Sequence, residues 1–309
     1  MNKVMKILVF TEKPFAATAV KAIQNVIDAA GADMKLVERG TREDLLEAVK
    51  DVEGLIVRSD IIDAEVINNA PNLKVIVRAG AGYDNIDLQA ATNHGICVMN
   101  TPGQNSNAVA ELVFGMIVMM CRNKYNGTSG SELKGKSLGI YAFGQVGRNV
   151  ARIATGFGMD VKALDVFVPD EVMIQQGVTP VHDVKQLFAE NDFVSLHIPS
   201  TPETRNSIGY DLVVSMPKNG VLVNTARKEV IDEEGLIKAL EERTDLRYVS
   251  DIKPANAEEF EKKFADRVFF TPKKMGAQTA EANFNAGVAA AEQAIAYLRD
   301  GWNKYQVNK

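Results

Sequence analysis

The chain has 309 residues, of which 46% are hydrophobic and 24% charged, which is typical of a globular protein of about two domains and not of a disordered one. Its formal net charge of -5, with basic and acidic residues interleaved, argues against nucleic acid and anionic membranes as partners. No apolar run reaches the roughly 18 residues that cross a bilayer, and the apolar start is too short for a signal peptide, so we expect a cytoplasmic protein.

The first third of the chain alternates short β-rich runs with amphipathic helical stretches, which is the pattern of an α/β fold. The predicted strands are 6–10, 34–38, 54–59, 74–80 and 96–100, with helices near 16–30 and 41–51. Residues 1–100 therefore read as one small doubly wound domain.

A second series follows a helix of about 18 residues within 100–123 and a polar, Gly-rich loop at 124–135. Its strands are predicted near 136–142, 160–165, 192–199, 220–226, 248–252 and 267–272, and a last helix over 280–298. Helical segments between the strands indicate a parallel sheet covered on both faces. The fold class is thus α/β with two doubly wound domains.

The strongest local motif is a strand that ends at Ala142, a turn with Gly144 and Gly147, and a helix. This matches the dinucleotide fingerprint G-x-G-x-x-G with Ala142 in place of the first glycine. Gly144 is expected to let the backbone approach a pyrophosphate, and Gly147 to let the helix pack closely on the strand. The alternative is that these glycines serve only a tight turn.

The start of this helix, with Gln145 and Val146, offers free N–H groups and a positive dipole end to the phosphates. Asp165 closes the next strand and is placed to accept hydrogen bonds from a ribose diol. Because its charge would repel a 2'-phosphate, we expect NAD rather than NADP. Cys97 and Cys121 lie in apolar segments without CxxC spacing, so we expect packing residues and no metal site.

With these motifs the chain resembles the D-isomer-specific 2-hydroxy acid dehydrogenases. The marks run in order over nearly the whole sequence: 78–91, 100–115, the fingerprint, 194–209, 222–236 and 276–282. Within the family, "NTARKEVIDE" and "TPKKMGAQTAEAN" are most similar to the short form of D-3-phosphoglycerate dehydrogenase, which lacks an appended regulatory domain. From the length after the last helix we likewise expect no such domain here.

The resemblance implies an architecture. A Rossmann NAD domain, residues 101–285, would be inserted into a smaller flavodoxin-like substrate domain of residues 1–100 and 286–309, with the active site between them. The family usually forms a homodimer through the NAD domain. The apolar stretch "LVFGMIVMM" at 112–120 would supply that surface or belong to the core.

Carried over to this sequence, the resemblance implies that Arg227 binds the substrate carboxylate. A guanidinium just past a strand, at the carboxyl edge of a parallel sheet, can hold a carboxylate through two hydrogen bonds. The alternative is a surface arginine paired with Glu229. Asp251 matches the family aspartate at the nicotinamide end of the cofactor. Further cofactor contacts are expected from residues at strand ends: His197, Ile198, Thr225 and Ala226.

On the substrate side, the resemblance implies a cradle of backbone N–H groups around Gly80, Ala81 and Gly82, with Asn105 nearby. Arg58 and Ser59 end a predicted strand and could reach a substrate phosphate. They could equally form a solvated edge.

The family's catalytic histidine and its glutamate partner are missing. Alignment on "GAQT" puts Lys274 in the position of the histidine, alignment on "TP" puts Lys273 there, and Asn256 lies near the expected glutamate. His94 and His182 lie in polar segments far along the chain. A lysine can take up and release the substrate's hydroxyl proton only if its pKa falls toward neutrality. Nearby cations and burial lower the pKa of a lysine, and a nearby carboxylate raises it. We favour Lys274; the alternative is two surface lysines.

The implied reaction is NAD-linked oxidation of 3-phospho-D-glycerate to 3-phosphohydroxypyruvate, which leads to serine. One alternative is a reductase of hydroxypyruvate, glyoxylate or another D-2-hydroxy acid. A second alternative is a binding protein that senses NADH and has lost its chemistry, as the departures at Ala142 and at the acid/base position would allow.

Overall fold

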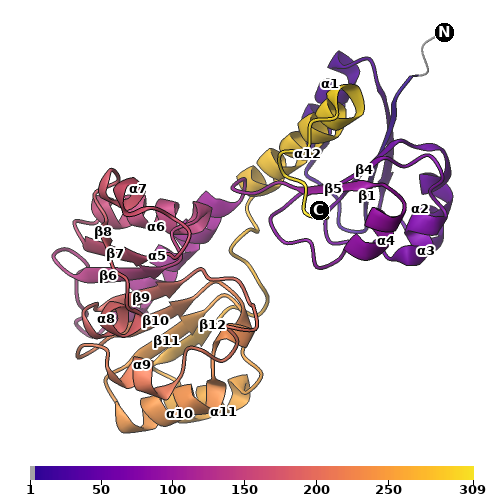
Figure 1. The fold of residues 1–309 in the computed structure, drawn as a ribbon. Coiled ribbons are helices and arrows are strands. Elements are labelled where there is room, and N and C mark those ends of the chain that lie inside the picture. The colour runs from indigo at the N-terminus through magenta and orange to yellow at the C-terminus, as the bar shows by residue number, and fades with distance from the viewer. Residues whose placement is uncertain (1–3) are drawn as a thin grey trace. The chain divides into compact units, whose positions relative to one another are not determined.

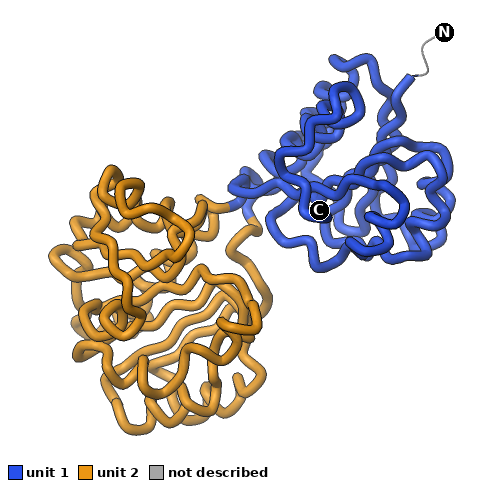
Figure 2. The backbone as a smooth tube through the Cα atoms, in the orientation of Figure 1, with its two compact units in different colours: residues 1–105, 279–309 blue, residues 106–278 orange. Residues whose placement is uncertain are grey.

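The computed structural model describes residues 4–309, which divide into two compact units. Unit 1 comprises residues 1–105 and 279–309, and unit 2 comprises residues 106–278, as Figure 2 shows in two colours. Each unit has its own parallel sheet, so the α/β fold with two doubly wound sheets is confirmed.

Unit 1 is built on a parallel sheet of five strands in the order β2-β1-β3-β4-β5. The strands are β1 Lys6–Thr11, β2 Asp33–Glu38, β3 Gly54–Val57, β4 Val75–Arg78 and β5 Cys97–Asn100. Between them lie α1 Ala17–Ala29, α2 Arg42–Ala48, the 3-10 turn η1 Val49–Asp51, α3 Ala64–Asn68 and α4 Leu88–Asn93, and the chain returns as α12 Ala280–Asp300.

Helices cover both faces of this sheet because alternate strand residues point to opposite sides (Figure 1). In β1, Ile7 and Val9 join a core with residues of α1 and α12. Leu8 and Phe10 join another core with residues of α2, α3 and α4. The inner strands β1, β3 and β4 are therefore almost continuously apolar, whereas the edge strand β2 is polar and mostly exposed.

Unit 2 holds a parallel sheet of seven strands in the order β12-β11-β10-β9-β6-β7-β8. Its strands are β6 Ser137–Tyr141, β7 Asp160–Leu164, β8 Thr179–Pro180, β9 Phe193–Leu196, β10 Val221–Asn224, β11 Arg247–Ser250 and β12 Val268–Phe270. The order reverses between β6 and β9, which is the switch point where doubly wound folds bind their ligands.

Two helical layers flank this second sheet. One core contains residues of α5 Ser106–Cys121, α6 Gln145–Gly156 and α7 Asp170–Ile174. The other contains residues of α8 Val184–Ala189, α9 Tyr210–Val214, α10 Glu233–Glu242 and α11 Ala257–Phe264. Short 3-10 turns occur at η2 Asn123–Tyr125 and η3 Lys228–Val230.

The apolar stretch at 112–120 belongs mostly to the core of unit 2. Val113, Phe114, Met116, Ile117 and Met120 are buried there, and other residues of the stretch pack against the same core while partly exposed. Most of its hydrophobicity is therefore explained without a partner chain. Among the described residues, no helix is long and apolar enough to cross a membrane.

The units join at 105/106 and 278/279, whereas the sequence suggested limits after 100 and after 285. Thr101 N donates to the carbonyl of Gly80 (3.0 Å), which holds the segment after β5 in unit 1. Thr279 caps α12 by accepting from Ala282 N (3.0 Å), and α12 packs along its length on α1, β3 and β4. The limits between the units therefore fall where α5 and α12 begin, so that each helix belongs to one unit.

The C-terminal residues pair with β5 at the edge of the unit 1 sheet, and Asn308 fixes them there. Its Oδ1 accepts from Val98 N (2.8 Å), and its Nδ2 donates to the carbonyl of Ile96 (2.8 Å) and to Thr92 Oγ1 (3.1 Å). Asn308 is buried, so its removal would leave main-chain groups of the edge strand without partners.

We expect Asn308→Ala to lower the free energy of unfolding of unit 1 by about 1–3 kcal/mol. Trp302 is the only tryptophan and lies in unit 1, so its fluorescence in a urea titration reports that unit. The exposed Asn303, whose Nδ2 bonds only Gln306 Oε1 (2.8 Å), provides the control Asn303→Ala. Equal midpoints for the two variants would contradict the prediction.

Candidate functional site

The fingerprint turn between β6 and α6 is shaped by two close backbone approaches. Ala142, in place of the first glycine, has φ +81, a conformation that residues with a side chain rarely adopt. A Cβ at Gly147 would lie 2.3 Å from the carbonyl oxygen of Ala142, so only glycine lets α6 sit this close to β6. A Cβ at Gly144 would meet nothing within 4 Å, so the space above the N-cap of α6 is open.

Gln145 and Val146 form the first turn of α6, and Asp165, at the end of β7, ties this region together. Its Oδ2 accepts from Phe143 N (2.7 Å), and its Oδ1 accepts from Phe167 N (2.8 Å) and Val168 N (3.2 Å). A carboxylate can accept about four hydrogen bonds, so about one acceptor position is left for a ribose hydroxyl.

The strand order brings the other predicted residues of unit 2 to one edge. Asp165 follows β7, the fingerprint follows β6, and His197 and Ile198 follow β9. Thr225, Ala226 and Arg227 follow β10, Asp251 follows β11, and the turn with Lys273 and Lys274 follows β12. Since all these strands are parallel, these segments leave the same carboxyl edge, in that spatial order.

His197 is bonded through both ring nitrogens to hydroxyl groups. Nε2 lies 3.0 Å from Ser195 Oγ and Nδ1 lies 3.1 Å from Thr225 Oγ1. Burial lowers the pKa of His197 to about 3, so the ring is neutral at any ordinary working pH. This histidine therefore orients its neighbours and is not suited to proton transfer.

Of the other two histidines, His94 lies in unit 1 and His182 follows β8, at the end of this edge. His94 Nδ1 lies 2.9 Å from the carbonyl of Ala90 at the end of α4, and His182 Nε2 lies 3.1 Å from Asp170 Oδ2. Among the described residues, His197 and His182 are the histidines that follow strands of this sheet, and β8 lies at the opposite end of the sheet from β12.

Asn224 holds the turn that carries Arg227. Its side chain is fully buried, and the sequence pattern did not predict it as a site residue. Asn224 Nδ2 donates to the carbonyl of Arg227 (3.0 Å), and its Oδ1 accepts from Ala226 N (2.9 Å). Arg227 itself is half-buried, and its Nη1 donates to the carbonyl of Ala226 (3.1 Å). The guanidinium is thus presented on a rigid turn.

Asp251 is fully buried and faces the turn after β12. Its Oδ1 accepts from Thr271 Oγ1 (3.1 Å) and Met275 N (2.7 Å), and its Oδ2 accepts from Gly276 N (2.7 Å). Lys273 and Lys274 lie between these bonded residues, and both are exposed. The sequence predicts Asp251 as a cofactor contact, and this second set of bonds was missed because it depends on a distant segment.

The substrate-side candidates lie in unit 1, where Arg58 follows β3. Its Nη1 donates to the carbonyls of Lys13 (2.9 Å) and Pro14 (3.0 Å), and its Nη2 donates to Asn283 Oδ1 (2.6 Å). The guanidinium also lies over the ring of Phe15, 5.1 Å from its centre. Arg58 therefore anchors the loop after β1, and much of its donor capacity is already used.

The predicted backbone cradle follows β4. Gly80 has φ +151 and donates its N–H to the carbonyl of Arg78 (2.8 Å), so this N–H is not available to a ligand. In the described part of the chain the N–H groups of Ala81 and Gly82 have no such partner, and Asn100 Nδ2 donates to the carbonyl of Ala81 (2.6 Å). The cradle thus reduces to these two N–H groups.

Arg78 is a further cation at this edge that sequence reasoning missed. Its Nε donates to the carbonyl of Arg58 (2.9 Å), and a Cβ at Gly80 would lie 1.5 Å from its Nη1. The guanidinium therefore occupies the space that the missing side chain of Gly80 leaves. The signal was present in the sequence, because Arg78 ends a strand just as Arg58 does. Ser59 is exposed and Asn105 half-buried.

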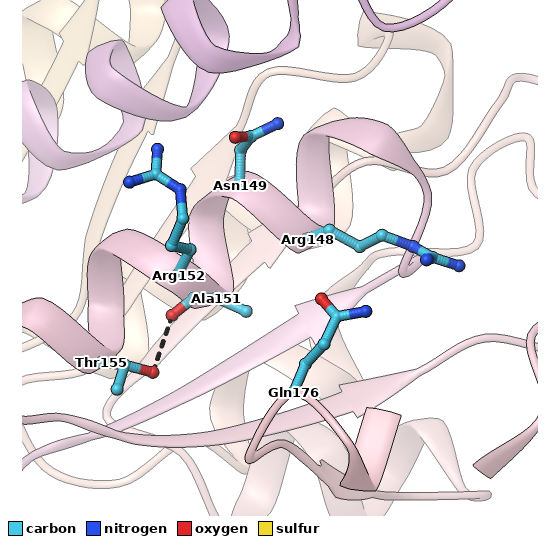
Figure 3. Close-up of a pocket in the computed structure, with 6 residues that line it drawn as sticks. All are labelled: Arg148, Asn149, Ala151, Arg152, Thr155 and Gln176. Carbon is cyan, nitrogen blue, oxygen red and sulfur yellow. Dashed lines mark hydrogen bonds between the residues drawn. The ribbon is translucent and has the colours of Figure 1, made fainter. Parts of the chain in front are cut away.

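A separate hollow of about 420 Å³ lies on the outer side of α6. Figure 3 shows that the side chains of Arg148 and Arg152 point in different directions, while Thr155 bonds the carbonyl of Ala151 (3.0 Å). Its polar groups do not converge, and no residue predicted from the sequence lines it. Within residues 4–309, no group of three or more His, Cys, Asp or Glu is placed to hold a metal ion.

Comparison with known proteins places this geometry in a family. The model of the D-isomer specific 2-hydroxyacid dehydrogenase catalytic domain matches residues 7–308. A solved 3-phosphoglycerate dehydrogenase of Entamoeba histolytica, with NAD+ bound, is 47% identical with a TM-score of 0.88, and the match covers 99% of each chain.

Two curated relatives are similar over most of this chain. D-3-phosphoglycerate dehydrogenase of Methanocaldococcus jannaschii is 38% identical over 96% of this chain, which spans only 58% of that relative's length. Hydroxypyruvate reductase of Thermotoga maritima is 36% identical over 82% of this chain and 87% of the relative. The chain belongs to the D-isomer specific 2-hydroxyacid dehydrogenase family.

Proposed function

We propose that this protein is an NAD-dependent dehydrogenase that oxidises 3-phospho-D-glycerate to 3-phosphohydroxypyruvate. The observation that carries the proposal is the order of groups along one sheet edge: an acidic residue and fingerprint at β7 and β6, and an arginine, a buried aspartate and a lysine turn at β10, β11 and β12. The similarity to the NAD+-bound Entamoeba histolytica enzyme supports it. Serine synthesis is the route that would use this product.

The residues of the fingerprint fit a dinucleotide. Open space at Gly144 and the first turn of α6 suit a pyrophosphate, and Asp165 keeps about one acceptor position for a hydroxyl of the adenosine ribose. Val166 and Phe167, next to it, are 81% and 89% exposed, which suits contact with an apolar base. The bound nicotinamide supplies the acceptor for the hydride that leaves C2 of the substrate.

Arg227 is assigned to the substrate carboxylate, because a guanidinium on a rigid turn fixes the orientation of the neighbouring carbon. Arg58 and Arg78, with the N–H groups of Ala81 and Gly82, are assigned to the phosphate end. Of the two arginines, Arg78 is the better candidate for direct contact, because its Nη1 lies directly beside the backbone of the cradle at Gly80.

Lys274 is assigned to the hydroxyl proton at C2, with Lys273 as the alternative. His197 is neutral and bonded through both nitrogens, and His182 follows β8 at the opposite end of the sheet from the lysine turn, so neither histidine replaces the missing one. A neutral lysine amine can accept the hydroxyl proton during oxidation, and its ammonium can return the proton during reduction.

A second candidate function is reduction of hydroxypyruvate or glyoxylate. The similarity to the Thermotoga maritima hydroxypyruvate reductase and to a glyoxylate reductase of Thermococcus litoralis favours it. The third candidate, an inactive NADH-binding sensor, predicts binding without turnover. For the assembly we propose a homodimer formed through unit 2, and for the location the cytoplasm.

We expect Lys274→Ala to lower turnover with 3-phosphohydroxypyruvate and NADH by about 100- to 10,000-fold, since a general acid/base contributes that much. NADH affinity, measured by fluorescence titration, should stay within about twofold because the lysine does not hold the cofactor. Lys273→Ala, in the same exposed turn, is the matched control and should keep near-normal turnover. The reverse result would assign the proton to Lys273, and normal turnover in both variants would reject a lysine acid/base.

We expect Arg78→Ala to raise the KM for 3-phosphohydroxypyruvate by about 10- to 100-fold, because the loss of a charged hydrogen-bond donor weakens binding of the phosphate. The KM for hydroxypyruvate should change little. Both are measured by NADH oxidation in the wild type and the variant. Equal effects on the two substrates, or a wild type without preference for the phosphorylated acid, would favour the second candidate function.

A further inference from the structure

The turn between β12 and α12 has little packing of its own. Residues 272–275 are exposed, while Thr271 and Gly276 at its two ends are buried. Gln278 N donates to the carbonyl of Met275 (2.8 Å), just before the chain enters unit 1. An exposed turn next to an interdomain connection would be mobile unless hydrogen bonds fix it.

The buried carboxylate of Asp251 supplies such bonds. It accepts from Thr271 before the two lysines, and from the consecutive N–H groups of Met275 and Gly276 after them. Charge-assisted hydrogen bonds of 2.7 Å are strong ones. The carboxylate therefore fixes the main chain on both sides of Lys273 and Lys274.

Gly276 is part of the same arrangement. A Cβ at this position would lie 2.8 Å from Asp251 Oδ2 and 3.2 Å from Val109 Cγ2. Only glycine therefore allows its N–H to reach the carboxylate without displacing either neighbour. The residue is not in the left-handed region, so the requirement is for space and not for backbone conformation.

Asp251 is itself fixed relative to the turn of Arg227. Its N–H donates to the carbonyl of Asn224 (3.0 Å), and the side chain of Asn224 holds Ala226 and Arg227. Asn224 at the end of β10 and Asp251 just after β11 thus hold both turns that carry the proposed catalytic cations.

We propose that Asp251 is a positioning residue that acts through the lysine turn, in addition to any contact it makes with the cofactor. This inference rests on the proposed function of Lys274 as acid/base. Its action is to hold the amine at the distance from C2 that proton transfer requires, because a displacement of about 1 Å can cost about 100-fold in rate.

The test is a double-mutant cycle. Asp251→Asn keeps the shape but cannot accept all three bonds, and Gly276→Ala displaces the carboxylate without changing any charge. Each is made in the wild type and in Lys274→Ala, and turnover is measured at saturating 3-phosphohydroxypyruvate with enough enzyme to quantify the slow variants. We expect a loss of about 10- to 100-fold in the wild-type background and less than about twofold in Lys274→Ala.

The control is Asp192→Asn, which removes a carboxylate at the opposite edge of the same sheet, where Asp192 Oδ2 accepts from Ser137 N (2.9 Å) and Ser137 Oγ (3.0 Å). It should cause no selective loss of turnover. NADH affinity is measured for every variant, and should stay within about threefold in Gly276→Ala.

Three outcomes would overturn the inference, each in a recognisable way. If Asp251→Asn costs the same factor with and without Lys274, Asp251 acts on the cofactor and not through the lysine. If Gly276→Ala leaves turnover unchanged, the position of the turn does not depend on its hydrogen bonds to Asp251. If Lys274→Ala by itself is fully active, Lys274 is not the acid/base. Asp251 then has no catalytic amine to hold in position.

Discussion

The candidate site depends first on the parallel arrangement of the unit 2 strands. Because β6, β7, β9, β10, β11 and β12 all run in one direction, each strand delivers its following segment to the same edge of the sheet. Residues far apart in the sequence, such as Asp165 and Lys274, belong to one row for that reason. The burial of these strands on both faces provides the stability, and the loops are left to carry the polar groups.

The sequence predicted well those features that depend on local pattern. Apolar runs gave the strands, and the spacing of Gly144, Gly147 and Asp165 gave the turn between β6 and α6. The alternation of strands and helices gave the parallel sheets. These signals are local because periodicity and turn chemistry act over a few residues.

Contacts between distant segments could not be predicted in the same way. Nothing near Arg58 in the sequence shows that its guanidinium is bonded to residues 13, 14 and 283. Likewise, the bonds from Asp251 to residues 271–276 depend on the pairing of β11 with β12. The packing of Arg78 over Gly80 follows from one side-chain conformation, which a sequence pattern does not specify.

The structure keeps the geometry of the nucleotide-binding turn although the sequence departs from the family pattern there. Ala142 adopts a positive φ at an expected cost of about 1–2 kcal/mol, and the carbonyl of this residue is what requires glycine at position 147. The close approach of α6 to β6 is therefore kept although the first glycine is not. A departure that preserves the backbone geometry of a nucleotide-binding turn gives no support to loss of function.

The same reasoning applies to the missing histidine and glutamate. A carboxylate directed at the lysine would stabilise its ammonium form and oppose proton transfer near neutral pH. Asp251, the buried carboxylate of this turn, directs three of its hydrogen bonds to Thr271, Met275 and Gly276, and so holds the main chain of the turn. Because the lysine side chain is long and flexible, fixing the backbone of the turn limits the positions that its amine can reach. An aspartate bound to the backbone gives this turn rigidity where a histidine site would use a carboxylate to orient the base itself.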